Sequence, residues 1–339
     1  MRRANSTFVI AEAGVNHNGS VSLAKELIDA AKAAGADAVK FQTFNTKRLA
    51  SRCAVKADYQ RRTTDPDERQ FEMLKRLELN EKAHFQLVDF CARKKIAFLS
   101  SAFDLDSADL LERTGMEIYK IPSGEITNVP LLRHIAEKQK EIILSTGMCT
   151  LGEVEEALDT IQLSGNSRVR LLHCVTEYPA PVESVNLRAM VTLRNAFHLP
   201  VGYSDHTKGF EIAIAAVALG AEIIEKHLTL AKTMKGPDHE ASLDPEEFKN
   251  MVNAIRNVES SLGDGVKRPA ACEVKNIPIA RKSAVASRTI KRGEKITANK
   301  VTLKRPGYGI QPKDLEKVYG LRATSVIQPD EVLTWDKVN

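Results

Sequence analysis

The sequence predicts an α/β protein in which a (β/α)8 barrel, or TIM barrel, precedes a small β-rich domain. Eight short apolar runs recur between residues 8 and 225, and helical periodicity separates them. Strictly alternating strand and helix patterns are typical of a parallel sheet, and eight such units close into a barrel. After residue 262 the alternation stops, which predicts the second domain.

The expected strands are short, apolar runs bounded by polar or turn-forming residues. They cover residues 8–11, 38–41, 97–100, 118–121, 142–145, 169–173, 201–203 and 223–225. Helical periodicity is clearest at residues 23–34, 108–113, 131–138, 154–163, 211–219 and 248–262. The connection over residues 43–69 is long, polar and without clear periodicity, which is typical of a functional lid or a mobile segment.

Changes in composition give the expected domain boundaries. We expect a barrel domain over residues 1–264, a linker over residues 265–281 and a β-rich domain over residues 282–339. The last domain contains a weak internal repeat, because residues 286–301 align with residues 323–338 at a constant offset. Two similar β-arches packed about a pseudo-twofold axis would explain this repeat.

The bulk composition is typical of a globular protein with a solvated, mixed-charge surface, and it suits small anionic substrates. Hydrophobic residues make up 43% and charged residues 27%, both ordinary values for such proteins. The net charge of +5 is spread along the chain, so no basic stripe indicates a nucleic-acid partner. A modest positive balance suits phosphates and carboxylates.

We expect the protein to be cytoplasmic. Its five cysteines are odd in number and form no CxxC pair, which argues for a reducing compartment. The apolar run before Glu12 is too short for the core of a signal peptide, and no stretch is long enough to span a membrane.

Almost every expected strand ends in polar or ionisable residues, and active sites of such barrels lie at the C-terminal ends of the strands. The candidate site residues at these ends are Glu12, Lys40, Gln42, Ser101, Lys120, Ser123, Ser145, Thr176, Glu177, Tyr178, His206, Glu225 and His227.

Two histidines and two lysines indicate the chemistry. His206 and His227 follow adjacent strands, and neutral imidazole is a common ligand of divalent metals. Two such ligands leave positions open for substrate oxygens, an arrangement suited to polarising a carbonyl. Lys40 and Lys120, with small hydroxyls and glycines nearby, predict a cradle for phosphate and carboxylate. From the residues alone, a Schiff-base aldolase also stays open.

The motifs resemble those of the N-acetylneuraminate (sialic acid) synthase family, which includes legionaminic acid synthases. They occur in family order over almost the whole chain. The matching segments are IAEAGVNHNG (10–19), VKFQ (39–42), YKIPSGE (119–125), LSTGM (144–148), YPAP (178–181), SDHT (204–207), EKH (225–227), GPD (236–238) and RPGYG (305–309). The C-terminal domain resembles the antifreeze-like (SAF) domain of these enzymes, a likeness of fold that does not imply ice binding.

The resemblance implies a carbohydrate-biosynthetic transferase that condenses phosphoenolpyruvate with an N-acylated mannosamine-type sugar and releases phosphate. Glu12 would manage protons, while His206 and His227 would hold Mn²⁺ or Mg²⁺. Family members are domain-swapped homodimers, so Arg305 would enter the partner's barrel. The residues expected to bind phosphoenolpyruvate are Lys40, Gln42, Ser101, Lys120, Ser123 and Ser145. Those expected to bind the sugar are Thr176, Glu177, Tyr178, Glu225, Asp238 and Arg305. Because both lysines then act as anion ligands, the aldolase is disfavoured.

One departure bears on the sugar. Where sialic acid synthases carry an Asn two positions before the strand-6 Tyr, this chain has Thr176, followed by Glu177. This stretch is more similar to legionaminic-acid-type synthases, so 2,4-diacetamido-2,4,6-trideoxymannose is weighted slightly above N-acetylmannosamine, and a 6-phosphorylated sugar is a weaker third option.

Two alternatives to this activity are a 3-deoxy-heptulosonate-type synthase and a non-catalytic sugar-binding homologue. The C-terminal RPG motif at Arg305 disfavours the first. The presence of Glu12, both lysines and both histidines disfavours the second.

Overall fold

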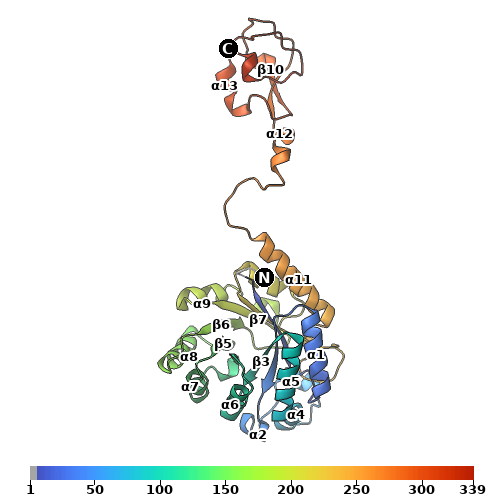
Figure 1. Ribbon diagram of the computed structural model, residues 1–339, viewed down its shortest axis with the longest axis vertical. Helices are drawn as coiled ribbons and strands as arrows, with labels where there is room; N and C mark the ends of the chain where they lie inside the picture. The colour runs from blue at the N-terminus through green and yellow to red at the C-terminus, as the bar shows by residue number, and fades with distance from the viewer. Residues whose placement is uncertain (1–5) are drawn as a thin grey trace. The chain divides into compact units, whose positions relative to one another are not determined.

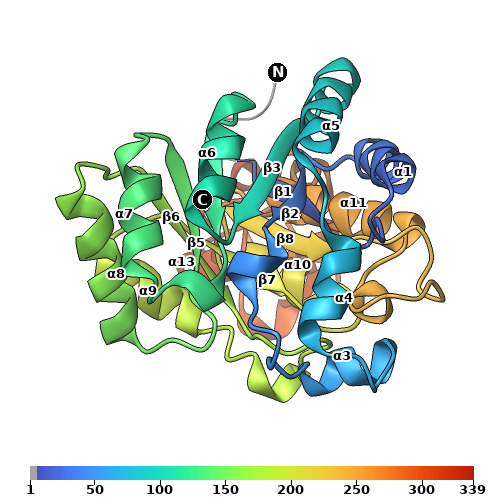
Figure 2. The same ribbon diagram turned by 90° about the horizontal axis from the view of Figure 1, so that it is seen from below.

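The computed structural model describes residues 6–339, and the chain forms two compact units that divide after Gly263. In the first unit, eight parallel strands close into a barrel in sequence order, and helices surround it (Figures 1 and 2). The expected fold class is therefore confirmed. Residues 1–5 of the expected barrel domain lie outside the described residues.

Each barrel strand coincides with an expected one, and most extend further at their C-terminal ends. Glu12, Gln42, Ser101 and His227 consequently lie in strands rather than in the loops after them. The strands are β1 (Phe8–Gly14), β2 (Ala38–Thr43), β3 (Ala97–Ala102), β4 (Ile118–Ile121), β5 (Glu141–Ser145), β6 (Val169–Cys174), β7 (Val201–Asp205) and β8 (Ile223–His227).

The barrel helices begin mostly at residues whose side chains accept backbone N–H groups of the first turn, as Ser20, Asn80, Asp104, Thr150 and Asp244 do. They are α1 (Val21–Ala33), α5 (Glu81–Lys94), α6 (Leu105–Arg113), α7 (Val129–Glu137), α8 (Leu151–Leu163), α9 (Ala189–Phe197), α10 (Glu211–Ala218) and α11 (Pro245–Ser261).

The long connection after β2 contains short helices that its polar sequence did not reveal. They are α2 (Thr46–Leu49) and α3 (Asp58–Thr63), and α4 (Gln70–Leu77) follows them before α5. The first two have too few residues to show a helical period. In α3 no residue is buried, so no apolar stripe marks it in the sequence.

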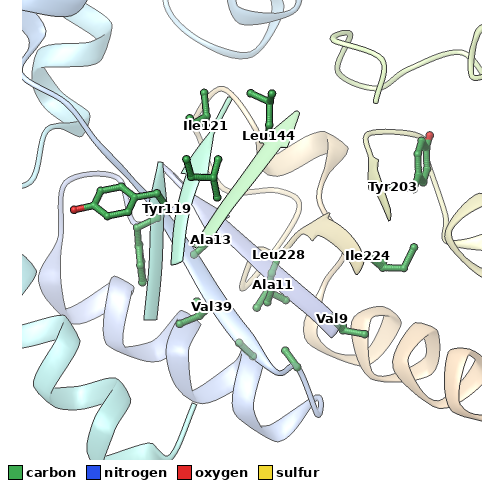
Figure 3. Close-up of a cluster of buried hydrophobic side chains, with 14 of the residues drawn as sticks. Val9, Ala11, Ala13, Val39, Tyr119, Ile121, Leu144, Tyr203, Ile224 and Leu228 are labelled. Atoms are coloured by element: carbon green, nitrogen blue, oxygen red, sulfur yellow. The ribbon is translucent and has the colours of Figure 1, made fainter. Parts of the chain in front are cut away.

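Apolar side chains cover both faces of the strands. On the outer face, residues such as Val9, Val39, Tyr119 and Ile224 pack in one large cluster with the helices (Figure 3). Inside the barrel, a smaller cluster forms what we call the inner apolar layer: Ile10, Ala38, Leu99, Ile143, Leu172 and Ile223. The interior is so full that a Cβ at Gly202 would lie 2.3 Å from the carbonyl oxygen of Ile223.

The second unit contains β9 (Ser283–Ala286) and β10 (Val301–Lys304), an antiparallel pair, with α12 (Ile277–Ala280) and α13 (Leu315–Val318). Its pairing confirms the expected repeat. Ala286 pairs with Val301 and the equivalent Ala323 with Val338, while Ile290 pairs with its own counterpart, Ile327. Such self-pairing of equivalent residues is what a pseudo-twofold axis requires.

Within residues 6–339, no helix combines the length and the apolar character needed to cross a membrane.

Candidate active site

A ring of polar side chains lies above the inner apolar layer, toward the C-terminal ends of the strands. Successive residues of a strand point to opposite faces, so a residue two places beyond the inner apolar layer also points inward. Glu12, Lys40, Ser101, Ser145 and Glu225 all stand in this relation to it. Lys120 joins them, because its strand neighbour in the register is Ser101. Strand alternation thus brings these predicted residues together.

Two acidic and two basic side chains form a buried network in this ring. The ammonium nitrogen of Lys40 lies 2.7 Å from Glu12 Oε2 and 3.7 Å from Glu225 Oε2. The ammonium nitrogen of Lys120 lies 3.7 Å from Glu225 Oε1. All four residues are at most 4% exposed. Glu225 therefore lies between the two lysines and partly neutralises both.

Burial and neighbouring charges shift the pKa values of these groups in different directions. Burial raises the pKa of Glu12 despite the nearby Lys40 ammonium. Burial also lowers the pKa of Lys120, although Glu225 opposes this. Burial by itself would also lower the pKa of Lys40, but the negative charges of Glu12 and Glu225 outweigh burial and raise this pKa. An anionic substrate would compete with Glu225 for both cations.

Hydroxyl groups extend the cradle around the lysines. Lys120 Nζ donates to Ser145 Oγ at 2.7 Å, and Lys40 Nζ donates to Ser101 Oγ at 3.2 Å. Ser123 Oγ accepts the Gly147 N–H at 2.9 Å. A Cβ on Gly147 would lie within 2.9 Å of three side-chain atoms, including Ser123 Oγ. Only glycine lets the backbone approach so closely here.

The predicted metal-binding histidines are neighbours at the barrel mouth, with ring centroids 5.6 Å apart. Burial lowers the pKa of His206 to about 4 and that of His227 well below its usual value, so both imidazoles are neutral. His206 Nδ1 donates a hydrogen bond to the Val175 carbonyl oxygen at 2.6 Å, so the lone pair of this neutral ring is on Nε2, 3.4 Å from Ser204 Oγ. The buried Nδ1 of His227 has no hydrogen-bond partner within the described residues.

Two neighbouring neutral imidazoles, of which His206 is held by its hydrogen bond to Val175, fit a divalent ion of the Mn²⁺ class. Among the described residues, however, no group of three or more His, Cys, Asp or Glu side chains is arranged to hold a metal. The chain would thus supply two ligands and leave the other positions to water or substrate.

Among the residues of the first unit that are expected to bind the sugar, Tyr178 contacts both histidines. The Tyr178 ring lies 4.2 Å from that of His206 and 5.5 Å from that of His227. Thr176 is half-buried beside Gly147, whereas Glu177 is exposed. Gln42 Nε2 donates to Glu12 Oε1 at 3.3 Å. Burial and the charge of Glu12 raise the pKa of Asp238 to about 7.

Arg305, also expected to bind the sugar, lies in the second unit just after β10. It is exposed, and its Nε donates to the Ala280 carbonyl oxygen at 3.0 Å.

Comparison with known proteins places the chain. Residues 27–267 match the model of the NeuB family, and residues 281–339 match that of the SAF domain. The chain belongs to the NeuB family. It is 53% identical over 329 residues to the N,N'-diacetyllegionaminic acid synthase of Campylobacter jejuni, a match that covers 96% of this chain and 98% of that protein. The enzyme of the same name from Legionella pneumophila is 47% identical over 335 residues, and the match covers 98% of this chain and 94% of that protein.

A solved structure agrees with this assignment. The N-acetylneuraminic acid synthetase of Leptospira borgpetersenii, crystallised with citrate, has a TM-score of 0.71 at 36% identity and covers 80% of this chain and 90% of that one. Both the expected family and the expected SAF domain are confirmed.

Sequence reasoning missed the residues that brace the histidines of this NeuB protein. Lys226 is fully buried, and its ammonium lies 2.9 Å from Asp205 Oδ2 and 2.6 Å from the Thr207 carbonyl oxygen. Lys226 precedes His227 and Asp205 precedes His206 in the sequence. Because successive strand residues point to opposite faces, the Lys226–Asp205 pair lies on the outer face of the barrel, away from the histidines. Ser204 Oγ donates to Glu225 Oε1 at 3.0 Å. In the sequence, only the position of these residues next to the histidines could have pointed to them, and it does not show that residues of β7 and β8 contact each other.

Proposed function

We propose that this chain condenses phosphoenolpyruvate with 2,4-diacetamido-2,4,6-trideoxymannose to form N,N'-diacetyllegionaminate and phosphate. The observation that carries this proposal is the buried network of Lys40, Lys120, Glu12 and Glu225 beside two neutral histidines. The sugar is chosen because two relatives named for this product are similar to the chain over nearly its full length.

In this mechanism the lysines hold the anionic substrate. Lys40 and Lys120 bind the carboxylate and phosphate of phosphoenolpyruvate, and Ser101, Ser123 and Ser145 orient those groups by hydrogen bonds. Neither lysine becomes covalently attached. With both charges satisfied by the substrate, Glu225 is free to turn toward the sugar, next to Ser204 and His206.

The reaction forms one carbon–carbon bond and breaks one carbon–oxygen bond. The enol carbon of phosphoenolpyruvate attacks the aldehyde carbon of the open-chain sugar, whose oxygen takes up a proton. Water then adds to the carbon that bears the phosphate ester, and Glu12 accepts the proton of that water. Burial raises the pKa of Glu12, which makes its carboxylate a stronger base. Phosphate leaves with cleavage of the carbon–oxygen bond.

We further propose that His206 and His227 hold Mn²⁺ or Mg²⁺. Such an ion would supply Lewis-acid polarisation of the aldehyde. Supporting this, both imidazoles are neutral, and the contact with Val175 fixes the ring of His206.

The experiment that tests the activity is phosphate release from phosphoenolpyruvate with Mn²⁺ and either 2,4-diacetamido-2,4,6-trideoxymannose or N-acetylmannosamine. We expect release that depends on sugar, with the higher kcat/KM for the trideoxy sugar. A higher value for N-acetylmannosamine would assign the chain to N-acetylneuraminate synthesis. No release with either sugar would refute the synthase activity.

We also propose a cytoplasmic, domain-swapped homodimer in which Arg305 of each chain completes the partner's sugar site. All five cysteines are free, which suits a reducing compartment. In the second unit, Arg305 is exposed, as a residue that reaches another chain must be.

A complementation experiment tests the swap. Arg305→Ala and Lys120→Ala chains are each expected to be inactive. Mixed and allowed to exchange subunits, they should recover part of the activity, because one site per mixed dimer has both residues intact. Exchange without recovery would contradict the swapped arrangement.

A further inference from the structure

Helix α3 of the long β2–α5 connection contacts the loops that carry the expected sugar-binding residues. The ring centroid of Tyr59 lies 5.0 Å from that of Tyr178. Thr63 Oγ1 donates to the Pro237 carbonyl oxygen at 3.3 Å, next to Asp238. An exposed ion pair joins Arg62 and Glu177 at 3.9 Å. The connection therefore touches the loops after both β6 and β8.

These contacts place Tyr59 without making it part of a core. No residue of α3 is buried, and Tyr59 itself belongs to none of the hydrophobic clusters of the described residues. Its hydroxyl accepts a hydrogen bond from its neighbour Gln60 at 3.3 Å. Tyr59 thus contacts Tyr178 at the barrel mouth but does not pack into a hydrophobic core, so we expect its role to lie in binding and not in stabilising the fold.

A series of neighbouring aromatic rings connects the expected metal-binding histidines with Tyr59. His206 and His227 are followed by Tyr178, at 4.2 Å and 5.5 Å, and Tyr178 is followed by Tyr59 at 5.0 Å. In the proposed reaction the aldehyde end of the sugar lies at the histidines. If the rest of the open-chain sugar extends along these rings, its far end reaches Tyr59.

We propose that Tyr59 is a specificity-determining residue that selects sugars with apolar substituents at the end remote from the aldehyde. This inference rests on the synthase activity proposed above. The trideoxy sugar carries a methyl group at C6 and a second acetamido methyl at C4, where N-acetylmannosamine has hydroxyl groups. An aromatic ring stabilises buried methyl groups by removing them from water, whereas a hydroxyl buried there without a partner is penalised.

The test compares kcat/KM for the two sugars in the wild type, Tyr59→Ala and Tyr59→Phe. We expect Tyr59→Ala to lower kcat/KM for the trideoxy sugar about tenfold, equivalent to about 1.4 kcal/mol, and to leave that for N-acetylmannosamine within about twofold. Tyr59→Phe keeps the ring and should retain the preference. The KM for phosphoenolpyruvate should not change, because its expected ligands lie deeper in the barrel.

Phe71→Ala is the matched control. Phe71 is a half-buried aromatic residue of α4 in the same connection, and its ring lies against the Arg52 guanidinium at 5.0 Å. Truncation there should not alter the ratio of the two kcat/KM values. If Tyr59→Ala lowers activity equally with both sugars, or leaves the ratio unchanged, the specificity role is wrong while the synthase activity stands. If the wild type releases phosphate with neither sugar, the proposed function itself fails, and this inference fails with it.

Discussion

Two buried lysines of this barrel, Lys226 and Lys120, should differ in how much stability each loses on substitution by methionine. Lys226 is fully buried on the outer face of the strands, and its bond to Asp205 is only 2.9 Å long. Removing it leaves a buried carboxylate without its cation, which typically destabilises a protein by about 3–5 kcal/mol. At roughly 2–4 °C per kcal/mol for a domain of this size, the Tm should fall by roughly 6–20 °C.

Lys120 lies inside the barrel, and its loss should lower the free energy of unfolding by less than the loss of Lys226 does. Burial lowers its pKa, so the cation is held there against its solvation preference. Its carboxylate neighbour, Glu225, lies 3.7 Å away and keeps Lys40 at the same distance. Because Glu225 keeps Lys40 as a partner, Lys120→Met leaves no buried carboxylate without a cation, and it should cost less stability than Lys226→Met.

Thermal unfolding with and without phosphoenolpyruvate separates the two roles. A ligand at a hundredfold excess over its Kd stabilises the native state by about 2.7 kcal/mol. This stabilisation should persist in Lys226→Met and disappear in Lys120→Met. Equal losses of stability in the two variants would refute the ion-pair reasoning, and a ligand shift that survives in Lys120→Met would refute the assignment of Lys120 as an anion ligand.

Two further predictions concern the barrel mouth. His206→Ala should weaken Mn²⁺ binding, measured by calorimetry, and lower kcat in parallel; full activity in metal-stripped wild type would contradict the metal role. Asp238, whose pKa burial raises to about 7, favours the folded state in its protonated form. Its contribution is complete below pH 4 and is lost as pH rises through 7, so stability should fall over this interval. The free energy of unfolding is measured against pH in EDTA for the wild type and Asp238→Asn, and the substitution should remove up to about 4 kcal/mol of the pH dependence. Identical profiles for the two proteins would show that Asp238 is not buried as a neutral acid.

Much of the fold could be predicted because the barrel strands are nearly continuous apolar runs with polar ends. Ile143 and Ser145, two residues apart, illustrate why the site was also visible: the same alternation that buries one residue points the other into the barrel. The helices α2 and α3 escaped prediction, since a helix of one or two turns with no buried residue has no hydrophobic period to detect.

The sequence by itself determined the barrel, the family, the repeat in the SAF domain and the set of polar residues at the strand ends. These depend on local periodicity and on motif order, which the chain carries directly. Only the tertiary structure decided which groups meet. It paired Glu12 with Lys40, set Glu225 between two lysines, braced the histidine-bearing strands through Lys226 and Asp205, and brought Tyr59 against Tyr178. Such contacts join residues that are distant in the chain. They follow from the strand register and the path of the loops, which no local sequence pattern encodes.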